Sequence, residues 1–394
     1  MNIRSILLGV LFLCCGILRL FADDVAKPAT TEDEPLSIEA QAAVDELRKL
    51  LPAESEPIVM LEHIIKGSGL SAGDGWFAVA KSQTRFGWDY MAKKFDSNQD
   101  DTIEPKEFSG SEADFERLDR NGDQQITAAD FDWSEHSLTS SPGLKMFFMA
   151  DRDANGKVTE QEFISLYKML GAGEDEFLSI DELREQFPAT ESPAPANPKR
   201  PDKPSRSTLV LGLKNQEIGS LQPGPKLDDI APDFTLTTLQ GDAVTLSKEV
   251  GDKPIVLILG NFTCGPFRSQ AGNIEKLYER YKDRAKFFLI YVREAHPKES
   301  WWMMSNQRAG IDIAQPKDFS GRRAVAETCQ RHLDLKIPFL VDAIDDAVGS
   351  QYSGMPNRLY LIDQQGRIAF KNGRGPFGFH PRQLEQALIL LANP

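Results

Sequence analysis

A single cysteine lies between an apolar strand and an amphipathic helix, where a thiol can become a nucleophile. Thr263 and Cys264 follow an apolar strand over residues 255–259 and precede a helix over residues 267–284. The N-terminus of a helix stabilises a thiolate relative to a thiol, so we expect Cys264 to be more acidic than a free cysteine. Phe267 stands where a thioredoxin has its second cysteine, which excludes a simple C-x-x-C exchange.

A histidine and a glutamate follow the next apolar strand. The strand over residues 287–292 is followed by Glu294 and His296. An imidazole titrates near neutrality and can deliver a proton, while Glu294 and Tyr291 can orient it. The carboxyl ends of parallel strands meet at one edge of a sheet, so we expect His296 to lie near Cys264. The alternatives are a satisfied ring at a loop end for His296 and an ordinary surface charge for Glu294.

These segments resemble the iodothyronine deiodinases, whose thioredoxin-like fold carries selenocysteine in a T-U-P-P-F context and then a strand ending in Y-x-x-E-A-H-P. The similarity covers roughly residues 209–394, with Cys264 at the selenium position and Gly265 in place of the first proline. It implies a catalytic network that includes Tyr291 and Glu294, and a cis peptide bond before Pro356. The matching segments are residues 263–267, 291–297, 337–342, 356–362 and 375–377.

A second cysteine of the same region, Cys329, lies on a helix expected over residues 322–333. It is either a small buried hydrophobic residue or a resolving thiol that condenses with oxidised Cys264. The other two cysteines, Cys14 and Cys15, fall in the N-terminal apolar run. After removal of that run the chain would hold two cysteines, too few for a disulfide scaffold.

Three twelve-residue segments repeat the ligand spacing that Ca²⁺ prefers, with oxygen donors at positions 1, 3, 5, 7, 9 and 12, and they resemble EF-hand loops. The third has Gly156 at the sharp turn, so we expect it to bind most tightly. The first two have Asp101 and Gln124 there and are expected to bind more weakly. The predicted ligands are Asp96, Asn98, Asp100, Thr102, Glu104 and Glu107 in the first loop, Asp119, Asn121, Asp123, Gln125, Thr127 and Asp130 in the second, and Asp151, Asp153, Asn155, Lys157, Thr159 and Glu162 in the third.

Two further features refine this repeat. Ile103, at position 8 of the first loop, is expected to pair it with another loop. A fourth unit over residues 171–182 has lost its first carboxylate, which predicts a non-binding partner for the third loop.

The net charge and the N-terminal segment limit the classes of function that this protein can have. The 394-residue chain has a formal net charge of -14, which argues against nucleic-acid binding and agrees with cation binding. A basic start, an apolar run over residues 5–18 and Ala22 predict a cleaved signal peptide, and hence a secreted or periplasmic protein without a stable transmembrane span. The alternative is an uncleaved membrane anchor.

The chain divides into five parts by composition. Prolines dominate residues 188–208, which we interpret as a semi-rigid linker. Alternating strands and helices after it predict an α/β sheet. The expected parts are a signal peptide (1–22), an acidic segment with a helical lead-in (23–85), an all-α EF-hand module (86–187), the linker, and a thioredoxin-like α/β domain (209–394).

The combined expectation is an exported calcium-binding protein with a deiodinase-like thiol oxidoreductase domain. It would use Cys264 for reductive dehalogenation of iodinated phenols, with Ca²⁺ and a thiol reductant as cofactors and a small-molecule or thiol substrate. One alternative is a calcium-binding scaffold or adhesion protein with a catalytically silent thioredoxin-like domain. Another is a general peroxide or disulfide reductase.

Overall fold

The computed structural model describes residues 35–68, 70, 81–133, 142–171, 177–187, 204–376 and 378–392. The predicted signal peptide and residues 188–203 of the predicted linker lie outside these ranges. Within them, we find no helix that combines the length and the apolar character needed to span a bilayer.

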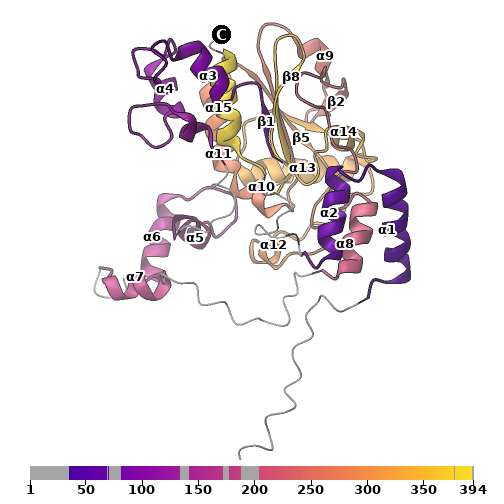
Figure 1. Ribbon diagram of the computed structural model, residues 1–394. Helices are drawn as coiled ribbons and strands as arrows, with labels where there is room; N and C mark the ends of the chain where they lie inside the picture. Colours follow the sequence, from indigo (N-terminus) through magenta and orange to yellow (C-terminus); the bar gives the residue numbers. More distant parts are fainter. Residues whose placement is uncertain are drawn as a thin grey trace, which may run out of the picture.

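An eight-stranded mixed sheet forms the centre of the protein (Figure 1). Strand β4 pairs in parallel with β5 and antiparallel with β7, and β5 pairs in parallel with β6. The antiparallel strands β8 and β1 extend one side of the sheet, and β2 and β3 extend the other. In chain order the strands are β1 (Gln83–Thr84), β2 (Thr235–Thr238), β3 (Ala243–Thr245), β4 (Ile255–Gly260), β5 (Lys286–Tyr291), β6 (Phe339–Val341), β7 (Arg358–Ile362) and β8 (Ile368–Lys371).

The central strands are apolar along their whole length because both faces of the sheet are covered. Val256 and Ile258 of β4 pack into the larger core, which also takes side chains from α11, α13 and α15. Ile255, Leu257 and Leu259 point into the opposite core. The helices of the α/β region are α8 (Arg206–Lys214), α9 (Leu246–Glu249), α10 (Gly265–Ser269), α11 (Ala271–Tyr281), α12 (Met304–Arg308), α13 (Phe319–Leu333), α14 (Ala347–Gln351) and α15 (Pro381–Ala392).

Three structural features of the region after residue 209 confirm the predicted thioredoxin-like α/β fold. The predicted strands and helices are present, although the helix expected over residues 267–284 is divided into α10 and α11 at Gln270. A strand that leads to the cysteine lies between a parallel and an antiparallel neighbour. The peptide bond before Pro356 is cis, as the resemblance implied, and so is the bond between Gly375 and Pro376.

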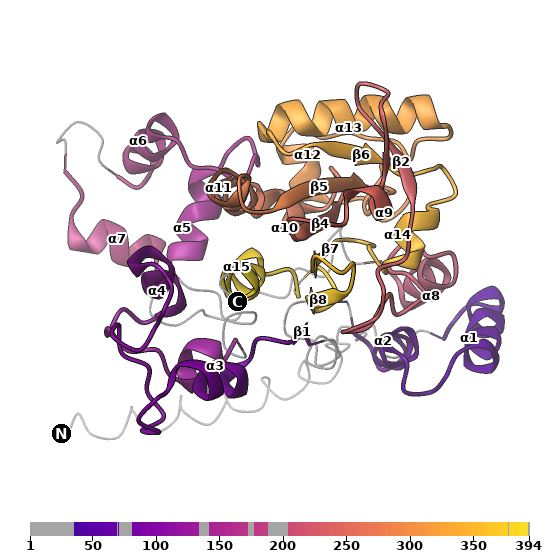
Figure 2. The same cartoon turned by 90° about the horizontal axis from the view of Figure 1, so that it is seen from above.

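The N-terminal helices pack against this domain rather than apart from it. Helices α1 (Ile38–Leu50) and α2 (Glu56–Ile65) form one apolar cluster with α8, side by side in both views (Figure 2). Strand β1 pairs with β8, so the end of the predicted lead-in joins the sheet. The last residues of the predicted linker begin α8.

The segments with the calcium-loop pattern also touch the α/β domain. The first two loops lie among α3 (Trp88–Phe95), α4 (Glu112–Leu118) and a 3-10 turn over Ala128–Phe131. Their buried Met91, Phe95 and Phe115 belong to the same core as α11 and α15. The third loop joins α5 (Pro142–Ala150) to α6 (Glu160–Met169), and α7 (Ile180–Gln186) follows.

Candidate functional site

Three chain segments meet at one edge of the sheet. Gly260, the last residue of β4, lies opposite Tyr291, the last residue of β5, so residues 261–264 and 292–296 leave the sheet side by side. Leu259 lies opposite Arg358, which brings Asn357 to the same edge. The fold therefore places Cys264, the Glu294–His296 segment and the cis-proline together. The strand order predicted that the first two are neighbours, and the resemblance implied the cis-proline.

A buried hydrogen-bond network connects the cysteine loop to the segment after β5. The carboxylate of Glu294 accepts from the Thr263 backbone N–H (2.9 Å) and from the Thr263 hydroxyl (2.7 Å). The Tyr291 hydroxyl also bonds this carboxylate and accepts from the N–H of Phe262 (3.1 Å). The backbone N–H of His296 donates to the Thr263 hydroxyl oxygen (3.0 Å). Thr263, Tyr291, Glu294 and His296 are thus brought into one cluster, directly next to Cys264.

Burial and hydrogen bonds shift the pKa of Glu294 in opposite directions. Loss of hydration raises the pKa of the buried Glu294 carboxyl, while the donors on Tyr291 and Thr263 lower it. The same burial, together with the charge of Glu294, raises the pKa of Tyr291 well above its usual range. Tyr291 therefore stays protonated and acts as a hydrogen-bond donor to Glu294.

The His296 ring lies at the rim of the cluster, half-buried against Trp301. Its Nδ1 is 2.9 Å from the Trp301 carbonyl oxygen, and the two ring centroids are 4.8 Å apart. A carbonyl oxygen only accepts, so Nδ1 carries a proton in this contact. With Nδ1 held by this contact, a proton delivered by the ring would come from Nε2 of the imidazolium form.

The environment of Cys264 corrects one prediction. Cys264 is the N-cap residue of α10, as expected, but only 1% of its surface is exposed. Loss of hydration raises the pKa of the thiol to about 11, and the α10 backbone, Arg268 and Asn357 offset only part of that rise. The predicted acidic thiol is therefore wrong for this closed site, because burial outweighs the helix N-terminus.

Asparagines that the sequence analysis did not single out hold the cysteine loop in place. The side-chain oxygen of Asn261 accepts from the backbone N–H groups of Cys264 and Ala295, at 3.1 Å each, and its amide donates to the Pro356 carbonyl (2.9 Å). One side chain thus ties together all three segments of the site. Its position directly after β4 was the available signal.

A second asparagine contacts the sulfur itself. The Nδ2 of Asn357 donates to the Cys264 Sγ at 3.3 Å. Its Oδ1 is buried and, among the described residues, has no hydrogen-bond donor. A Cβ at position 375 would lie 1.8 Å from this oxygen, so Gly375 leaves the space that Asn357 occupies.

Removing the Asn357 amide should make Cys264 less reactive. Asn357→Leu keeps the branched shape of the side chain but deletes a hydrogen bond that favours the thiolate. Such bonds contribute about 1.5–3 kcal/mol, so iodoacetamide alkylation of Cys264 at fixed pH should slow by about 10–100-fold. Asn273→Leu, at an exposed position of α11, is the control and should leave the rate unchanged. An Asn357→Leu rate equal to that of the wild type would show that the contact does not stabilise the thiolate.

The second thiol, Cys329, lies on α13 and is also buried. Burial raises its pKa well above the usual range, and the nearby Glu294 raises it further. Arg268 acts on the ionisation of both thiols, so Cys264 and Cys329 share one electrostatic environment. Both are free thiols in the structure. Cys329 can therefore still be either a buried hydrophobic residue or a resolving thiol.

The three twelve-residue loops share one backbone geometry. In each, the carboxylate at position 1 accepts a hydrogen bond from the N–H at position 6, whose φ is positive: 60° at Asp101, 67° at Gln124 and 77° at Gly156. In each, the carboxylate at position 12 accepts from the N–H at position 9. Ile103 and Ile126 form an isolated antiparallel bridge that joins the first two loops, which confirms the pairing expected for Ile103.

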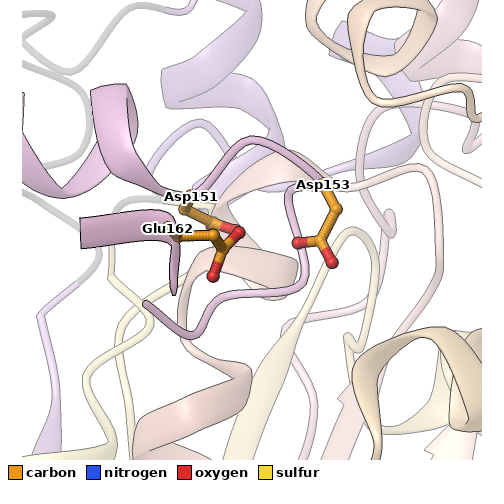
Figure 3. A group of neighbouring side chains, drawn as sticks. All are labelled: Asp151, Asp153 and Glu162. Atoms are coloured by element: carbon orange, nitrogen blue, oxygen red, sulfur yellow. The ribbon is translucent and has the colours of Figure 1, made fainter. Parts of the chain in front are cut away.

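The third loop gathers three carboxylates around one point. The ligand atoms of Asp151, Asp153 and Glu162 lie within 4.8 Å of one another (Figure 3). Partial burial, with the charges of Asp153 and Glu162, raises the pKa of Asp151 to about 6. The mutual proximity of these oxygens suits a hard divalent cation. The fourth unit keeps a capping box between Ser179 and Glu182, and residues 172–176 lie outside the described part.

Comparison with known proteins finds similarities in the C-terminal region. A family model described as iodothyronine deiodinase matches residues 219–390. A type I iodothyronine deiodinase of Xenopus laevis is 29% identical over 134 residues, covering 34% of this chain and 51% of that protein. A type II iodothyronine deiodinase of Fundulus heteroclitus is 26% identical over 179 residues, covering 45% of this chain and 67% of that protein.

The match to the Xenopus protein thus spans about half the length of that relative. Among solved structures, the thioredoxin domain of a thiol-disulfide oxidoreductase from Bacteroides vulgatus is similar to this chain. It has 16% identity and a TM-score of 0.29, and the match covers 43% of this chain and 98% of that domain. Together with the family model over residues 219–390, these relatives show that the C-terminal half of this chain is similar to the iodothyronine deiodinases.

Proposed function

We propose that this is an exported calcium-binding protein whose C-terminal domain is a thiol oxidoreductase acting on iodinated phenols. The observation that carries the proposal is the buried network that joins Thr263, next to Cys264, to Glu294 and His296 (Thr263 Oγ1 to Glu294 Oε2, 2.7 Å; His296 N to Thr263 Oγ1, 3.0 Å). The family relationship supports the choice of reaction. Export is supported by the apolar run over residues 5–18 and by Ala22.

The proposed reaction transfers iodine from carbon to sulfur. The Cys264 thiolate attacks iodine, an S–I bond forms as the C–I bond breaks, and the electron pair remains on the ring carbon. That carbon takes a proton from the His296 network. A second thiol, from Cys329 or an external reductant, then displaces iodide and forms a disulfide, which an external dithiol reduces. Carbon is reduced and two thiols are oxidised.

The residues around the sulfur suit the requirements of this reaction. Thr263, Glu294 and Tyr291 act as positioning residues, because they fix the loops that carry Cys264 and His296. The buried Asn357 Oδ1, on the same amide whose nitrogen contacts the sulfur, offers an acceptor that a phenolic hydroxyl could satisfy when the site opens. Because Cys264 is buried, the substrate reaches it only after the site opens.

Turnover by the purified full chain tests this proposal. Iodinated phenols and hydroperoxides are each supplied with a dithiol, and Cys264→Ser is the control. Release of iodide that Cys264→Ser abolishes is the expected result. Turnover of hydroperoxides alone would instead favour the general peroxide or disulfide reductase.

A second candidate function has its own observation. A thiol with a pKa near 11 and 1% exposure is also what a silent thioredoxin-like domain would contain. In that case the calcium loops would be the working part of a scaffold or adhesion protein. The absence of Cys264-dependent turnover with either substrate class would favour this function.

The proposed calcium sites lie in the three loops, with the third the tightest. Their common geometry and the cluster of Asp151, Asp153 and Glu162 support this proposal. Exported modules of this kind bind Ca²⁺ at about 10⁻⁴–10⁻³ M. Glu162→Gln should remove the tightest component of the heat in calorimetric titration, because Glu162 is the position-12 ligand. Glu160→Gln, an exposed neighbour outside the ligand pattern, should keep it. Retention of the component in Glu162→Gln would refute the ranking of the loops.

A further inference from the structure

The third twelve-residue loop lies directly against the helices that follow Cys264. The carbonyl of Gly156 accepts a hydrogen bond from the backbone N–H of Gly272 on α11 (3.2 Å). A Cβ on Gly156 would lie 1.9 Å from the Arg268 carbonyl oxygen, and a Cβ on Gly272 would lie 2.7 Å from the Gly156 carbonyl oxygen. Glycines at both positions therefore permit a close approach between the loop and the junction of α10 and α11.

The loop also contacts the C-terminal end of α13. The Nε2 of His332 is 2.9 Å from the carbonyl oxygen of Asp153, a predicted ligand at position 3. The ammonium of Lys157, at position 7, donates to the carbonyl of Asp334 (2.9 Å). Positions 3, 6 and 7 of one calcium loop thus face three elements of the thioredoxin-like domain.

Short paths run from these contacts to Cys264. The guanidinium of Arg268 donates to the Phe262 carbonyl (2.6 Å) and to the side chain of Asn306 (2.8 Å). Asn306 in turn donates to the carbonyl of Thr263 (2.9 Å). The ring of His332 packs edge-on against Phe262, with centroids 5.1 Å apart. Arg268, whose carbonyl lies against Gly156, therefore also fixes the backbone that leads to the thiol.

We propose that residues 268–272, His332 and Asp334 form a docking surface for the third loop, and that Ca²⁺ bound to the loop holds α10 closed over Cys264. The inference rests on the calcium site of the proposed function. An ion bound to the twelve-residue loop fixes its backbone, including the carbonyl at position 7 next to Gly156. An ordered loop keeps its contacts with Arg268 and Gly272, so the site opens less often.

The coupling must be reciprocal. If Ca²⁺ favours the closed site, then a modification that keeps Cys264 uncovered weakens Ca²⁺ binding by the same factor. Coupling between two sites of this kind usually corresponds to a factor of about 5–150. A buried thiol reacts through local opening, so the alkylation rate of Cys264 reports how often the site opens.

The test combines calorimetry with alkylation of the full chain. Calcium titration establishes binding at the third loop as the component that Glu162→Gln removes. Iodoacetamide alkylation of Cys264, followed by mass spectrometry of its peptide, is then measured with saturating Ca²⁺ and with a chelator. We expect Ca²⁺ to slow alkylation about 5-fold or more in the wild type and to have no effect in Glu162→Gln.

Two further variants separate the docking surface from general stabilisation. Gly272→Ala adds a Cβ against the Gly156 carbonyl without changing a predicted ligand, so it should reduce both the effect of Ca²⁺ on alkylation and the affinity of the third loop. Gly251→Ala, where an added Cβ meets nothing within 4 Å, is the matched control. Asp130→Asn in the second loop, whose carbonyl at Asp130 bonds Gln386 of α15, should preserve the effect.

Different outcomes test different claims. Calcium heat that Glu162→Gln removes, combined with alkylation rates that Ca²⁺ does not change, would overturn the docking proposal and leave the calcium site standing. Equal loss of the effect in Asp130→Asn and Gly272→Ala would also overturn it, because general stabilisation would then explain the result. The absence of any such heat would refute the calcium site and the docking proposal together. None of these measurements depends on turnover of iodinated phenols.

Discussion

Replacing His296 with alanine should lower kcat by about 10²–10⁴-fold and leave KM nearly unchanged, because general acid catalysis typically contributes this factor. The contact of Nδ1 with the Trp301 carbonyl means that the imidazolium would deliver its proton from Nε2. Alanine keeps the backbone N–H that donates to Thr263, so the network around Glu294 remains. The substitution therefore removes the proton donor with little change in the position of the cysteine loop.

The measurement is kcat and KM on iodinated phenols together with thermal unfolding. His63→Ala on α2 is the matched control, since it removes a half-buried ring away from the sheet edge. A purely structural His296 would instead lower the melting temperature and preserve kcat per folded molecule. That result would remove His296 from the mechanism and leave Cys264 as the single reacting group.

The second large effect concerns a buried ion cluster that joins α2 to the α/β domain. Glu56 of α2 accepts from Arg358 (3.2 Å) and from Arg374 (2.8 Å), whose side chains are 1% exposed. Lys371 lies nearby, and burial together with the charge of Arg358 lowers its pKa to about 7. Glu56 thus supplies negative charge to two buried guanidinium groups and anchors α2 to the α/β domain.

Glu56→Gln should destabilise the folded protein by about 3–5 kcal/mol, because it leaves buried cations without compensation. Urea unfolding at neutral pH would show a lower midpoint. The control is Glu62→Gln, which breaks the solvent-exposed ion pair with Arg48 and should cost at most about 1 kcal/mol. Equal effects of the two substitutions would mean that the cluster adds nothing beyond a surface pair.

The same cluster predicts a pH dependence. Burial alone would raise the pKa of Glu56, but the charges of Arg358 and Arg374 outweigh it and lower that pKa from 4.5 to about 2. A carboxyl with a depressed pKa in the folded state stabilises the protein above its unfolded pKa. This contribution should be lost as the pH falls from about 4.5 to about 2. Unfolding measured across that window should show a smaller loss in Glu56→Gln than in the wild type.

Short sequence patterns were enough to predict the features that arise from neighbouring residues in the chain. Continuous apolar runs predicted β4 and β5, because strands covered on both faces need no polar residues. The positions of Cys264 and the Glu294–His296 segment after two neighbouring strands predicted one site, because strand ends at the same edge meet. The cis-proline at Pro356 followed from the family resemblance instead. The ligand spacing of the twelve-residue loops could be read directly, since all their predicted ligands lie within one short segment.

Only the tertiary structure decided the features that depend on distant residues. Asn357 reaches the sulfur across 93 positions and Glu56 reaches Arg374 across 318, and such contacts follow from packing rather than from local pattern. The third loop contacts Gly272 of α11 only because of how α5 and α6, which flank the loop, are placed against the α/β domain. The shift in the pKa of Cys264 is also opposite to the one predicted from the sequence. Its place at a helix N-terminus was readable from the sequence, but its desolvation depends on every segment that covers it, and burial outweighs the helix.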